Sequence, residues 1–134
     1  MALSLDQVFA KVEPDSIGYV YDTPIHYIVL NRKDNSWNLD RINEYISILD
    51  KIEAIKAPGC LVTIGTGPKF FSIGFDLGYW MQDANNAFVS LVRFQELMAR
   101  LLTLKVPSMC VLNGTAIAGG YWLGLSHDFQ VMNA

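Results

Sequence analysis

Two kinds of hydrophobic pattern alternate along the chain. Short runs rich in β-branched and aromatic residues are typical of strands, and segments whose apolar residues recur at every third or fourth position are typical of amphipathic helices. Strands are predicted at residues 17–23, 25–31, 60–64, 108–112 and 128–132, and helices at residues 39–55, 87–104 and 118–127. The order β-β-α-β-α-β-α-β, with apolar strands between helices, predicts an α/β fold with parallel strand pairs.

The predicted helix boundaries rest on residues that cap or interrupt helices. Asn38 or Asp40 can cap the helix at residues 39–55, and Pro58-Gly59 follows its end. Pro107 ends the second helix in the same way, because proline cannot continue a helix.

Length and composition bound the domain organisation. The chain has 134 residues, of which 51% are hydrophobic and 17% charged, so one packed domain is expected over residues 1–134. The net charge of −3 and the lack of a basic run argue against nucleic-acid binding. Cys60 and Cys110 each lie in a short apolar run, which favours free thiols in strands over a disulfide. No Cys/His spacing indicates a metal site.

Neither a targeting segment nor a membrane span is expected. Residues 1–16 contain early acidic residues and no long apolar core, so they do not resemble a signal peptide. Residues 108–126 carry no charge and are about as long as a membrane span, but they contain Asn113, Thr115 and four glycines. A strand, a loop and a buried helix explain this composition better than a membrane helix does.

Two glycine-containing segments carry the candidate chemistry. Ile73-Gly74-Phe75-Asp76 and residues 113–120 each follow a predicted strand, and the second opens a predicted helix. A glycine pair at a helix N-terminus permits close backbone approach and leaves peptide N–H groups free to point at an anion. Two such segments from neighbouring strands can aim two N–H groups at one oxygen, which is the layout of an oxyanion hole. On the residues alone, two tight turns remain the alternative.

Three other patterns are interpreted as structural. The Gly65-Thr66-Gly67 turn lacks the spacing of a dinucleotide-binding loop. Ser126-His127-Asp128 has the residue types of a hydrolase triad, but consecutive residues cannot align a nucleophile, a base and an orienting carboxylate. His127 is therefore expected to pack or to cap a helix end, and His26 to be a half-buried structural histidine in a strand.

Both glycine segments resemble the signature regions of the crotonase (enoyl-CoA hydratase/isomerase) superfamily. FFSIGFDL resembles its F-S-x-G-x-D-L element, and VPSMCVLNGTAIAGGYWLGLSHDF resembles its element with N-G-x-[AC]-x-G-G-G at the centre. LNRKDNSWNL is similar to the family's L-N-R-P…N-A-L. The three segments occur in the family's order and cover nearly the whole chain. The resemblance implies the N-terminal part of a core built as a spiral of ββα turns, and therefore one incomplete domain.

The resemblance also implies a substrate and a set of binding residues. In this family two backbone N–H groups bind the thioester oxygen of an acyl-CoA and stabilise the enolate that forms when the adjacent carbon loses a proton. These groups map to Phe75 and Gly119. Substrate contacts are implied for Ser72, Ile73, Gly74, Asp76, Gly120 and Lys69, with Asp76 expected to brace the loop. No metal is implied, and no cofactor beyond the coenzyme A of the substrate.

One position separates the reactions of the family. Hydratases carry their first glutamate where this chain has Trp122, and an indole cannot activate water. FFSIGFDL and LGLSHDFQVM look like the corresponding strings of plant and peroxisomal-type Δ3,Δ2-enoyl-CoA isomerases, which move a double bond from position 3 to position 2 with one carboxylate base. The implied process is fatty-acid oxidation, and the implied compartment is the peroxisome or the mitochondrion.

The carboxylate base of these isomerases follows the strand predicted at residues 128–132, beyond Ala134. The glutamates of the chain do not match that position; they are Glu13, Glu44, Glu53 and Glu96. Half a spiral is also expected to expose apolar surface that a trimer-based homo-oligomer or other protein chains would cover. Three hypotheses follow: an active isomerase whose C-terminal portion supplies the base, an inactive structural or assembly subunit, and a protein that binds acyl-CoA without turnover.

Overall fold

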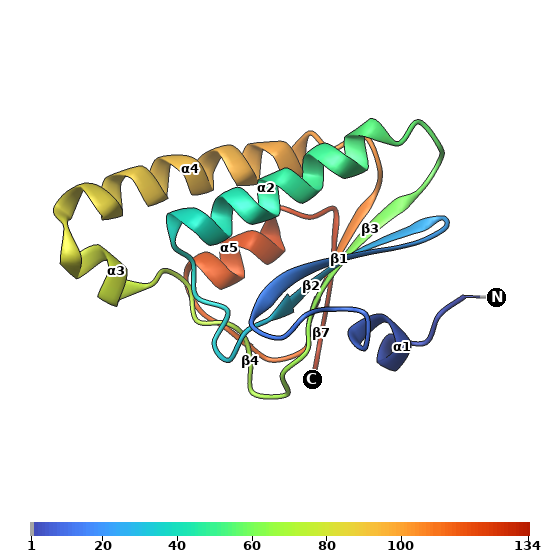
Figure 1. The fold of residues 1–134 in the computed structure, drawn as a ribbon, viewed down its shortest axis with the longest axis horizontal. Coiled ribbons are helices and arrows are strands. Elements are labelled where there is room, and N and C mark those ends of the chain that lie inside the picture. The colour runs from blue at the N-terminus through green and yellow to red at the C-terminus, as the bar shows by residue number, and fades with distance from the viewer. Residues whose placement is uncertain (1) are drawn as a thin grey trace.

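The structure, a computed structural model, describes residues 2–134 (Figure 1). Its helices are α1 (Leu5–Phe9), α2 (Leu39–Ala54), α3 (Leu77–Gln82), α4 (Ala84–Leu102) and α5 (Gly119–Leu125). Its strands are β1 (Ser16–Asp22), β2 (Ile25–Asn31), β3 (Cys60–Gly65), β4 (Phe70–Ser72), β5 (Ser108–Leu112), β6 (Thr115–Ala116) and β7 (Phe129–Met132). The predicted order is confirmed, with α1, α3, β4 and β6 added to it.

Five strands form the main sheet in the order β1-β2-β3-β5-β7. β1 and β2 pair antiparallel, and the other pairs are parallel. Because the strand order follows the chain, each right-handed crossover moves in the same direction and leaves its helix on the same face. Figure 1 shows α2, α4 and α5 together on one side of the sheet and α1 on the other. The fold is therefore α/β with parallel pairs, as predicted, and not a doubly wound sheet, whose crossover helices cover both faces.

A second, two-stranded sheet positions the glycine segments. β4 and β6 pair in parallel, with Phe70 opposite Thr115 and Ser72 opposite Ala116. β4 follows the carboxyl end of β3, and β6 follows the carboxyl end of β5. Since β3 and β5 are themselves neighbours in the main sheet, the segments that leave their ends lie side by side. Residues 73–76 and 117–120 continue directly from this small sheet.

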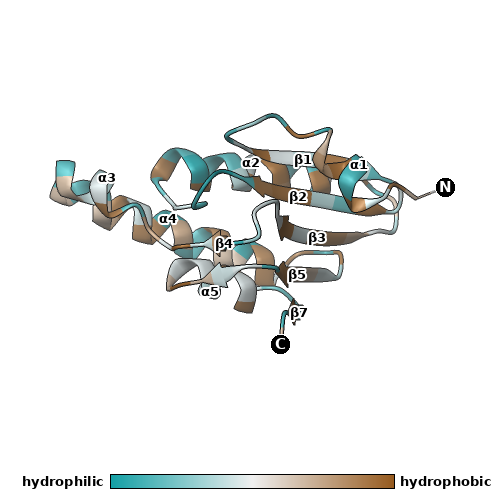
Figure 2. Cartoon of the chain, turned by 90° about the horizontal axis from the view of Figure 1, so that it is seen from below, coloured by the Kyte–Doolittle hydropathy of each residue, from teal (hydrophilic) through white to brown (hydrophobic). Residues whose placement is uncertain are grey.

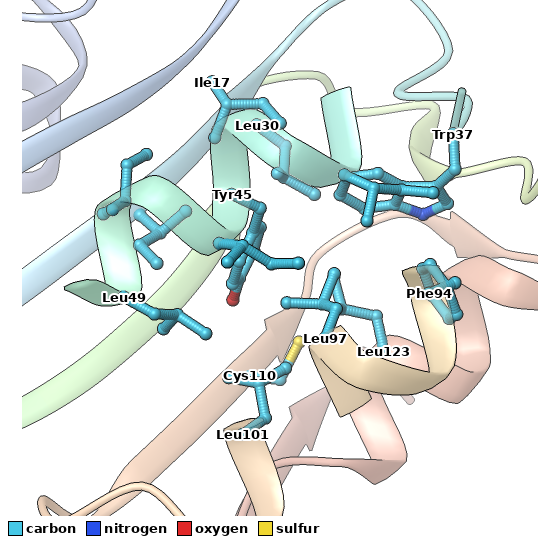
Figure 3. Close-up of a cluster of buried hydrophobic side chains, with 14 of the residues drawn as sticks. Ile17, Leu30, Trp37, Tyr45, Leu49, Phe94, Leu97, Leu101, Cys110 and Leu123 are labelled. Carbon is cyan, nitrogen blue, oxygen red and sulfur yellow. The ribbon is translucent and has the colours of Figure 1, made fainter. Parts of the chain in front are cut away.

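The main core lies between the sheet and helices α2, α4 and α5 (Figure 3). Tyr45 and Leu49 of α2, Phe94 and Leu97 of α4, and Leu123 of α5 are buried in it. The helical period predicted for α2 is confirmed, whereas in α4 only its C-terminal half follows the prediction, because Phe88, Leu91 and Val92 are exposed. Each of the buried side chains contributes about 1.5–3 kcal/mol on burial, so the three helices are held by this shared core rather than by their own propensities.

A smaller core on the opposite face joins α1 to the sheet. Tyr27 and Val29 of β2 lie in this second core, whereas Ile28 and Leu30 of the same strand lie in the main core. Successive side chains of a strand point to opposite faces, so a strand that is covered on both sides is apolar throughout. This explains the consecutive buried residues at 27–30 in β2, part of which Figure 2 shows in brown.

The elements that were not predicted are short or lack a hydrophobic period. α1 has five residues and is held by a capping box, in which the Gln7 N–H donates to Ser4 Oγ (3.2 Å) and the Ser4 N–H donates to the Gln7 side chain (2.9 Å). α3 begins directly after Asp76, whose side chain caps the helix. α4 begins at Ala84 rather than at residue 87, because Asp83 caps it there.

Residues 108–126, the uncharged stretch as long as a membrane span, divide into β5, β6 and α5, as expected from their glycines and polar residues. Within residues 2–134, no helix combines the length and the apolar character needed to cross a bilayer. Cys60 and Cys110 are free thiols in strands, as predicted. Burial raises the pKa of the Cys110 thiol.

Large apolar side chains remain exposed at the C-terminal edge of the sheet. β7 pairs with β5 on one side, and all four of its residues are exposed (Figure 2). The exposed apolar residues of α5, β7 and the loop before α5 are Ile117, Tyr121, Trp122, Leu125, Phe129, Val131 and Met132. The apolar surface expected for half a spiral is therefore present along α5 and β7, and α3 and α4 expose further apolar residues such as Met81 and Phe88.

Candidate active site

The first glycine segment is held against the backbone of Trp37. The Trp37 N–H donates to the Gly74 carbonyl (2.8 Å), and the Asp76 N–H donates to the Trp37 carbonyl (2.8 Å). These two bonds make a parallel bridge between Trp37 and Phe75. In a parallel bridge the residue between the two bonded groups directs its own N–H to the opposite side. The Phe75 N–H therefore points away from Trp37, and it meets no acceptor within residues 2–134.

Gly74 is required by both its backbone angle and its surroundings. Its φ of +92° lies in the region that side chains other than glycine rarely adopt. A Cβ at this position would also lie 2.8 Å from the Ile117 carbonyl oxygen. The glycine between two bulky residues is therefore explained by close contact with the second glycine segment.

The second glycine segment presents the open N-terminus of α5. Gly119 is the first residue of the helix, so its N–H has no partner within the helix. The residue in the capping position is Ala118, whose side chain cannot accept a hydrogen bond. Ala118 adopts a φ of +46°, which turns the chain sharply into the helix.

The two segments are brought together by backbone contacts. The Ile117 N–H donates to the Ser72 carbonyl (3.0 Å). A Cβ at Gly74 would lie 3.3 Å from the Gly119 nitrogen, and one at Gly120 would lie 2.4 Å from the Ser72 carbonyl oxygen. Two unpaired N–H groups, of Phe75 and Gly119, thus lie on adjoining backbone segments. Such a pair can donate two hydrogen bonds to an oxygen that carries negative charge.

Ser72 braces the first segment from inside. Its hydroxyl donates to the Asn35 carbonyl (2.8 Å) and accepts from the Gly74 N–H (3.2 Å). The Asn35 side chain in turn donates to the Phe71 carbonyl (2.8 Å). Ser72 is fully buried and its hydroxyl is occupied, so its side chain fixes the loop, and the predicted substrate contact of Ser72 remains a prediction.

Aromatic rings pack around the Phe75 side chain. The Phe75 ring lies 4.8 Å from Trp80, 5.0 Å from Phe94 and 6.2 Å from Trp122, measured between ring centres. These rings keep the first glycine segment in an apolar setting. Hydrogen-bond donors act more strongly on a developing charge where water is excluded.

The remaining predicted site residues have different surroundings. Asp76 caps α3 by accepting from the Tyr79 N–H (3.0 Å), and its predicted roles as a loop brace and a substrate contact remain predictions. The Ile73 N–H donates to the Asp34 carbonyl (3.0 Å). The Lys69 ammonium lies 5.1 Å from the centre of the Phe70 ring and lines a hollow of about 450 Å³ that neither Phe75 nor Gly119 borders. The contact of Lys69 with substrate also remains a prediction.

This arrangement of two glycine segments has counterparts among known proteins. Residues 22–134 match the family model described as enoyl-CoA hydratase/isomerase, which is most of the chain. The chain belongs to the enoyl-CoA hydratase/isomerase family. The resemblance found in the sequence is thereby confirmed.

Its similar curated relatives within this family include delta isomerases. Enoyl-CoA delta isomerase 3 of Arabidopsis thaliana is 35% identical over 105 residues, which cover 74% of this chain and 43% of that protein. Enoyl-CoA delta isomerase 2, peroxisomal, of the same plant is 33% identical and covers 74% and 44%. Enoyl-CoA delta isomerase 1, mitochondrial, of Mus musculus is 33% identical and covers 73% and 34%. The chain spans less than half the length of these relatives.

Solved structures of the family share the fold. An enoyl-CoA hydratase from Bacillus anthracis superposes with a TM-score of 0.82 at 27% identity, over 88% of this chain and 47% of that chain. An enoyl-CoA hydratase/isomerase family protein from Pseudomonas syringae gives a TM-score of 0.78 at 27% identity, over 88% and 50%. The crotonase-like fold predicted from the sequence is therefore confirmed for the part of the domain that this chain represents.

The carboxylates of this family member are engaged elsewhere. Glu44 lies 3.8 Å from Arg32, Glu53 lies 3.2 Å from Arg100, and Glu96 pairs with Arg93. Glu44 and Glu53 lie on α2, and Glu96 lies on α4. Within residues 2–134, no glutamate borders the Phe75 and Gly119 amides.

The consecutive Ser-His-Asp sequence does not form a triad. The Ser126 hydroxyl donates to the Trp122 carbonyl (2.9 Å), and Asp128 accepts from the Ser108 N–H (2.8 Å). His127 bonds the Leu123 carbonyl at the end of α5, as expected for a histidine at a helix end. His26 is buried rather than half-buried, with its Nδ1 atom 2.9 Å from the Tyr19 hydroxyl.

Proposed function

We propose that this chain forms the acyl-CoA-binding part of an enoyl-CoA delta isomerase. The observation that carries the proposal is the pair of unpaired N–H groups of Phe75 and Gly119 on adjoining backbone segments. Both would donate to the thioester oxygen of an acyl-CoA. The delta isomerases among the relatives support this choice within the family.

The proposed reaction moves a double bond from carbon 3 to carbon 2 of the acyl group. A base removes a proton from carbon 2, and the electrons of that C–H bond form a dienolate whose negative charge is shared between the thioester oxygen and carbon 4. The proton then returns at carbon 4, so that nothing is gained or lost overall. The two amides hold the oxyanion of the intermediate, and each donor in such a site lowers the barrier by roughly 3–4 kcal/mol.

Trp122 supports isomerisation over hydration. It is 44% exposed, and its ring packs edge-on against Phe75 beside the proposed oxygen site. An indole at this place offers apolar surface and no group that could take a proton from water. A reaction that adds no water therefore suits the site better than one that adds it.

The general base is proposed to come from outside residues 2–134. Asp76 caps a helix, and three of the four glutamates are in ion pairs away from the amides. The relatives are more than twice as long as the matched region, so a complete domain of this kind holds further residues. Fatty-acid oxidation in a peroxisome or mitochondrion is part of the proposal, in line with the names of the relatives.

A second candidate function is that of an inactive structural or assembly subunit. It is favoured by the apolar residues exposed on α5 and β7, together with the ion pairs that occupy three of the four glutamates within residues 2–134. Exposed apolar surface of this kind is usually covered by another chain. In this second reading, a homo-oligomer or a different protein would cover α5 and β7, and the amide pair would bind no substrate.

Binding of acyl-CoA separates the two candidates. We expect calorimetric titration to show binding of a long-chain acyl-CoA that is clearly tighter than binding of coenzyme A alone. Gly74→Ala should weaken acyl-CoA binding by about tenfold or more, because the new Cβ meets the Ile117 carbonyl and moves the two amides apart. Gly78→Ala in α3 is the matched control and should bind as the wild type does.

Two outcomes of this titration and one activity assay separate the possibilities. Equal affinity for acyl-CoA and coenzyme A would reject the oxyanion site and leave the structural subunit. Thioester-dependent binding that Gly74→Ala abolishes would support it. Conversion of a 3-enoyl-CoA to the 2-enoyl product, followed by absorbance of the conjugated thioester, would show in addition that a base is present.

A further inference from the structure

Three buried polar side chains cross the main core next to the proposed oxyanion site. Tyr45 of α2 and Thr63 of β3 have no exposed surface, and His127, which follows α5, is 4% exposed. The Tyr45 hydroxyl lies 2.7 Å from Thr63 Oγ1, and Thr63 Oγ1 lies 2.8 Å from His127 Nε2. His127 Nδ1 lies 2.8 Å from the Leu123 carbonyl oxygen. None of these groups has a part in the proposed reaction.

The Leu123 carbonyl, at the end of this row, fixes the direction of every hydrogen bond in it. A carbonyl oxygen can only accept, so His127 Nδ1 carries the hydrogen and Nε2 is the acceptor. The Thr63 hydroxyl therefore donates to Nε2, and it accepts from the Tyr45 hydroxyl. All three side chains are satisfied when the imidazole is neutral. Burial lowers the pKa of His127 to about 4, so the neutral form prevails at physiological pH.

We propose that His127 is a positioning residue for the oxyanion site, which fixes α5 and thereby the direction of the Gly119 N–H. The proposal rests on the proposed function, because it assigns His127 a role at that site. Leu123, whose carbonyl His127 holds, lies one helical turn after Gly119. The whole of α5 is seven residues, or about two turns, and moves as one unit.

A helix of seven residues is not stable without contacts to the rest of the protein. Isolated helices of this length are unstable, so contacts with the rest of the protein set its position: Leu123 is buried in the main core, and each end makes a further contact. At the start of α5 the Gly120 backbone packs against Ser72, and at the end the Leu123 carbonyl is held by His127. Loss of the second contact would let the end of α5 shift against the core. The N–H of Gly119, at the start, would then change direction.

The same row of side chains connects the backbone segments of both amides to Tyr45. Tyr45 packs edge-on against Trp37, with ring centres 6.1 Å apart, and the Trp37 backbone holds the segment that carries the Phe75 N–H. Through Thr63 and His127, Tyr45 is also connected to α5 and the Gly119 N–H. Figure 3 shows Tyr45 in the core, with Trp37 and Leu123 both to its right in this view. The spacing of the two donors is thus set through Tyr45.

The test measures polarisation of a bound thioester in variants of this row. His127→Phe keeps a ring and removes both hydrogen bonds, and Thr63→Val keeps the shape of the side chain and removes one hydroxyl. Val29→Ala is the control, because Val29 lies in the second core on the opposite face of the sheet. The readout is the infrared carbonyl band of an acyl-CoA labelled with carbon-13 at the thioester. A loss of stability alone would not move this band.

We expect the bound wild type to lower the frequency of this band, and Val29→Ala to lower it equally. In His127→Phe and Thr63→Val the band should return toward its position in free acyl-CoA. If both variants fold and keep the wild-type band, the positioning role is overturned. Thr63→Val, the milder change, keeps the test decisive if His127→Phe does not fold.

A failure of the proposed function would be recognised separately, because the wild type itself would then leave the band unchanged. In that case the amide resonances of Gly119 and Gly120 in the free protein decide the role of His127. Movement of both resonances in Thr63→Val, without movement in Val29→Ala, supports the control of α5 by His127. Unmoved resonances in Thr63→Val overturn it.

Discussion

Gly120→Ala is expected to lower the free energy of unfolding by about 3 kcal/mol. The added Cβ would lie 2.4 Å from the carbonyl oxygen of Ser72 and 2.9 Å from its carbonyl carbon. These are backbone atoms of β4 and cannot rotate away, so α5 must move as a whole. The Ile117 N–H bond to the same carbonyl is strained at the same time. Alanine's better helix propensity offsets only about 1 kcal/mol of this cost.

Gly78→Ala is the matched control for this prediction. Gly78 and Gly120 are both the second residue of a short helix, in α3 and α5 respectively. A Cβ at Gly78 would have the Asp76 side chain, at 3.3 Å, as its nearest neighbour. Urea unfolding should therefore place Gly78→Ala within about 0.5 kcal/mol of the wild type. Equal stability of Gly120→Ala and the wild type would mean that α5 does not pack against β4 as described.

Lowering the pH from about 7 to about 4 is expected to remove about 3 kcal/mol of stability through His127. Its pKa falls from the ordinary 6.5 to about 4 on folding, chiefly because burial penalises the charged ring. The unfolded chain therefore binds a proton at pH values where the folded protein does not. Stability from this histidine is complete above pH 6.5 and is lost as the pH falls toward 4. Burial lowers the pKa of His26 as well, which adds to the loss.

The surroundings of His127 disfavour protonation chiefly because the ring is buried. Thr63 donates to Nε2 and would have to turn away, and the neighbouring Tyr45 is neutral and buried. The hydrogen bonds of the ring with the Leu123 and Gly124 backbone and the charge of Asp128 oppose this effect but do not outweigh it. Urea unfolding at pH 7.5, 6.0 and 5.0 should show a steeper decline for the wild type than for His127→Gln, which cannot take up a proton. Parallel declines would contradict the assignment of a low pKa to His127.

The sequence predicted the larger elements because their periods are carried by side chains. In α2 the apolar residues recur with the helical period, and Asn38 caps the helix by accepting from the Arg41 N–H, as the sequence indicated. The β-branched and aromatic residues of β2 predict a strand. These signals are local, so no knowledge of the rest of the fold is needed to interpret them.

The small sheet and the Trp37 bridge have no such local signal. β4 and β6 contain three and two residues, and their pairing depends on β3 and β5 lying side by side. Trp37 lies within a segment that resembles the family, but its contribution is made by its backbone N–H and carbonyl. Every residue type except proline has the same backbone N–H and carbonyl, so this support for Phe75 could not be predicted from the sequence.

The candidate site was found through its glycines. Only glycine allows the φ of Gly74 and the close packing of Gly120, and these glycines indicated the candidate site, while the family resemblance assigned the donors to Phe75 and Gly119. The sequence could not show that the Ser72 hydroxyl is used inside the loop, because that depends on Asn35, more than thirty residues earlier in the chain. Which groups of the loop brace it and which remain free to bind therefore depends on tertiary contacts.

The most direct test of the central claim is a nuclear magnetic resonance titration of the nitrogen-15-labelled chain with a long-chain acyl-CoA. If the Phe75 and Gly119 amides bind the thioester oxygen, both of their proton resonances should move downfield on titration, and neither should do so with coenzyme A alone. The Gly74 amide, already bonded to Ser72, should move less than either. Binding of acyl-CoA that leaves the Phe75 and Gly119 resonances in place would contradict the proposed oxyanion site.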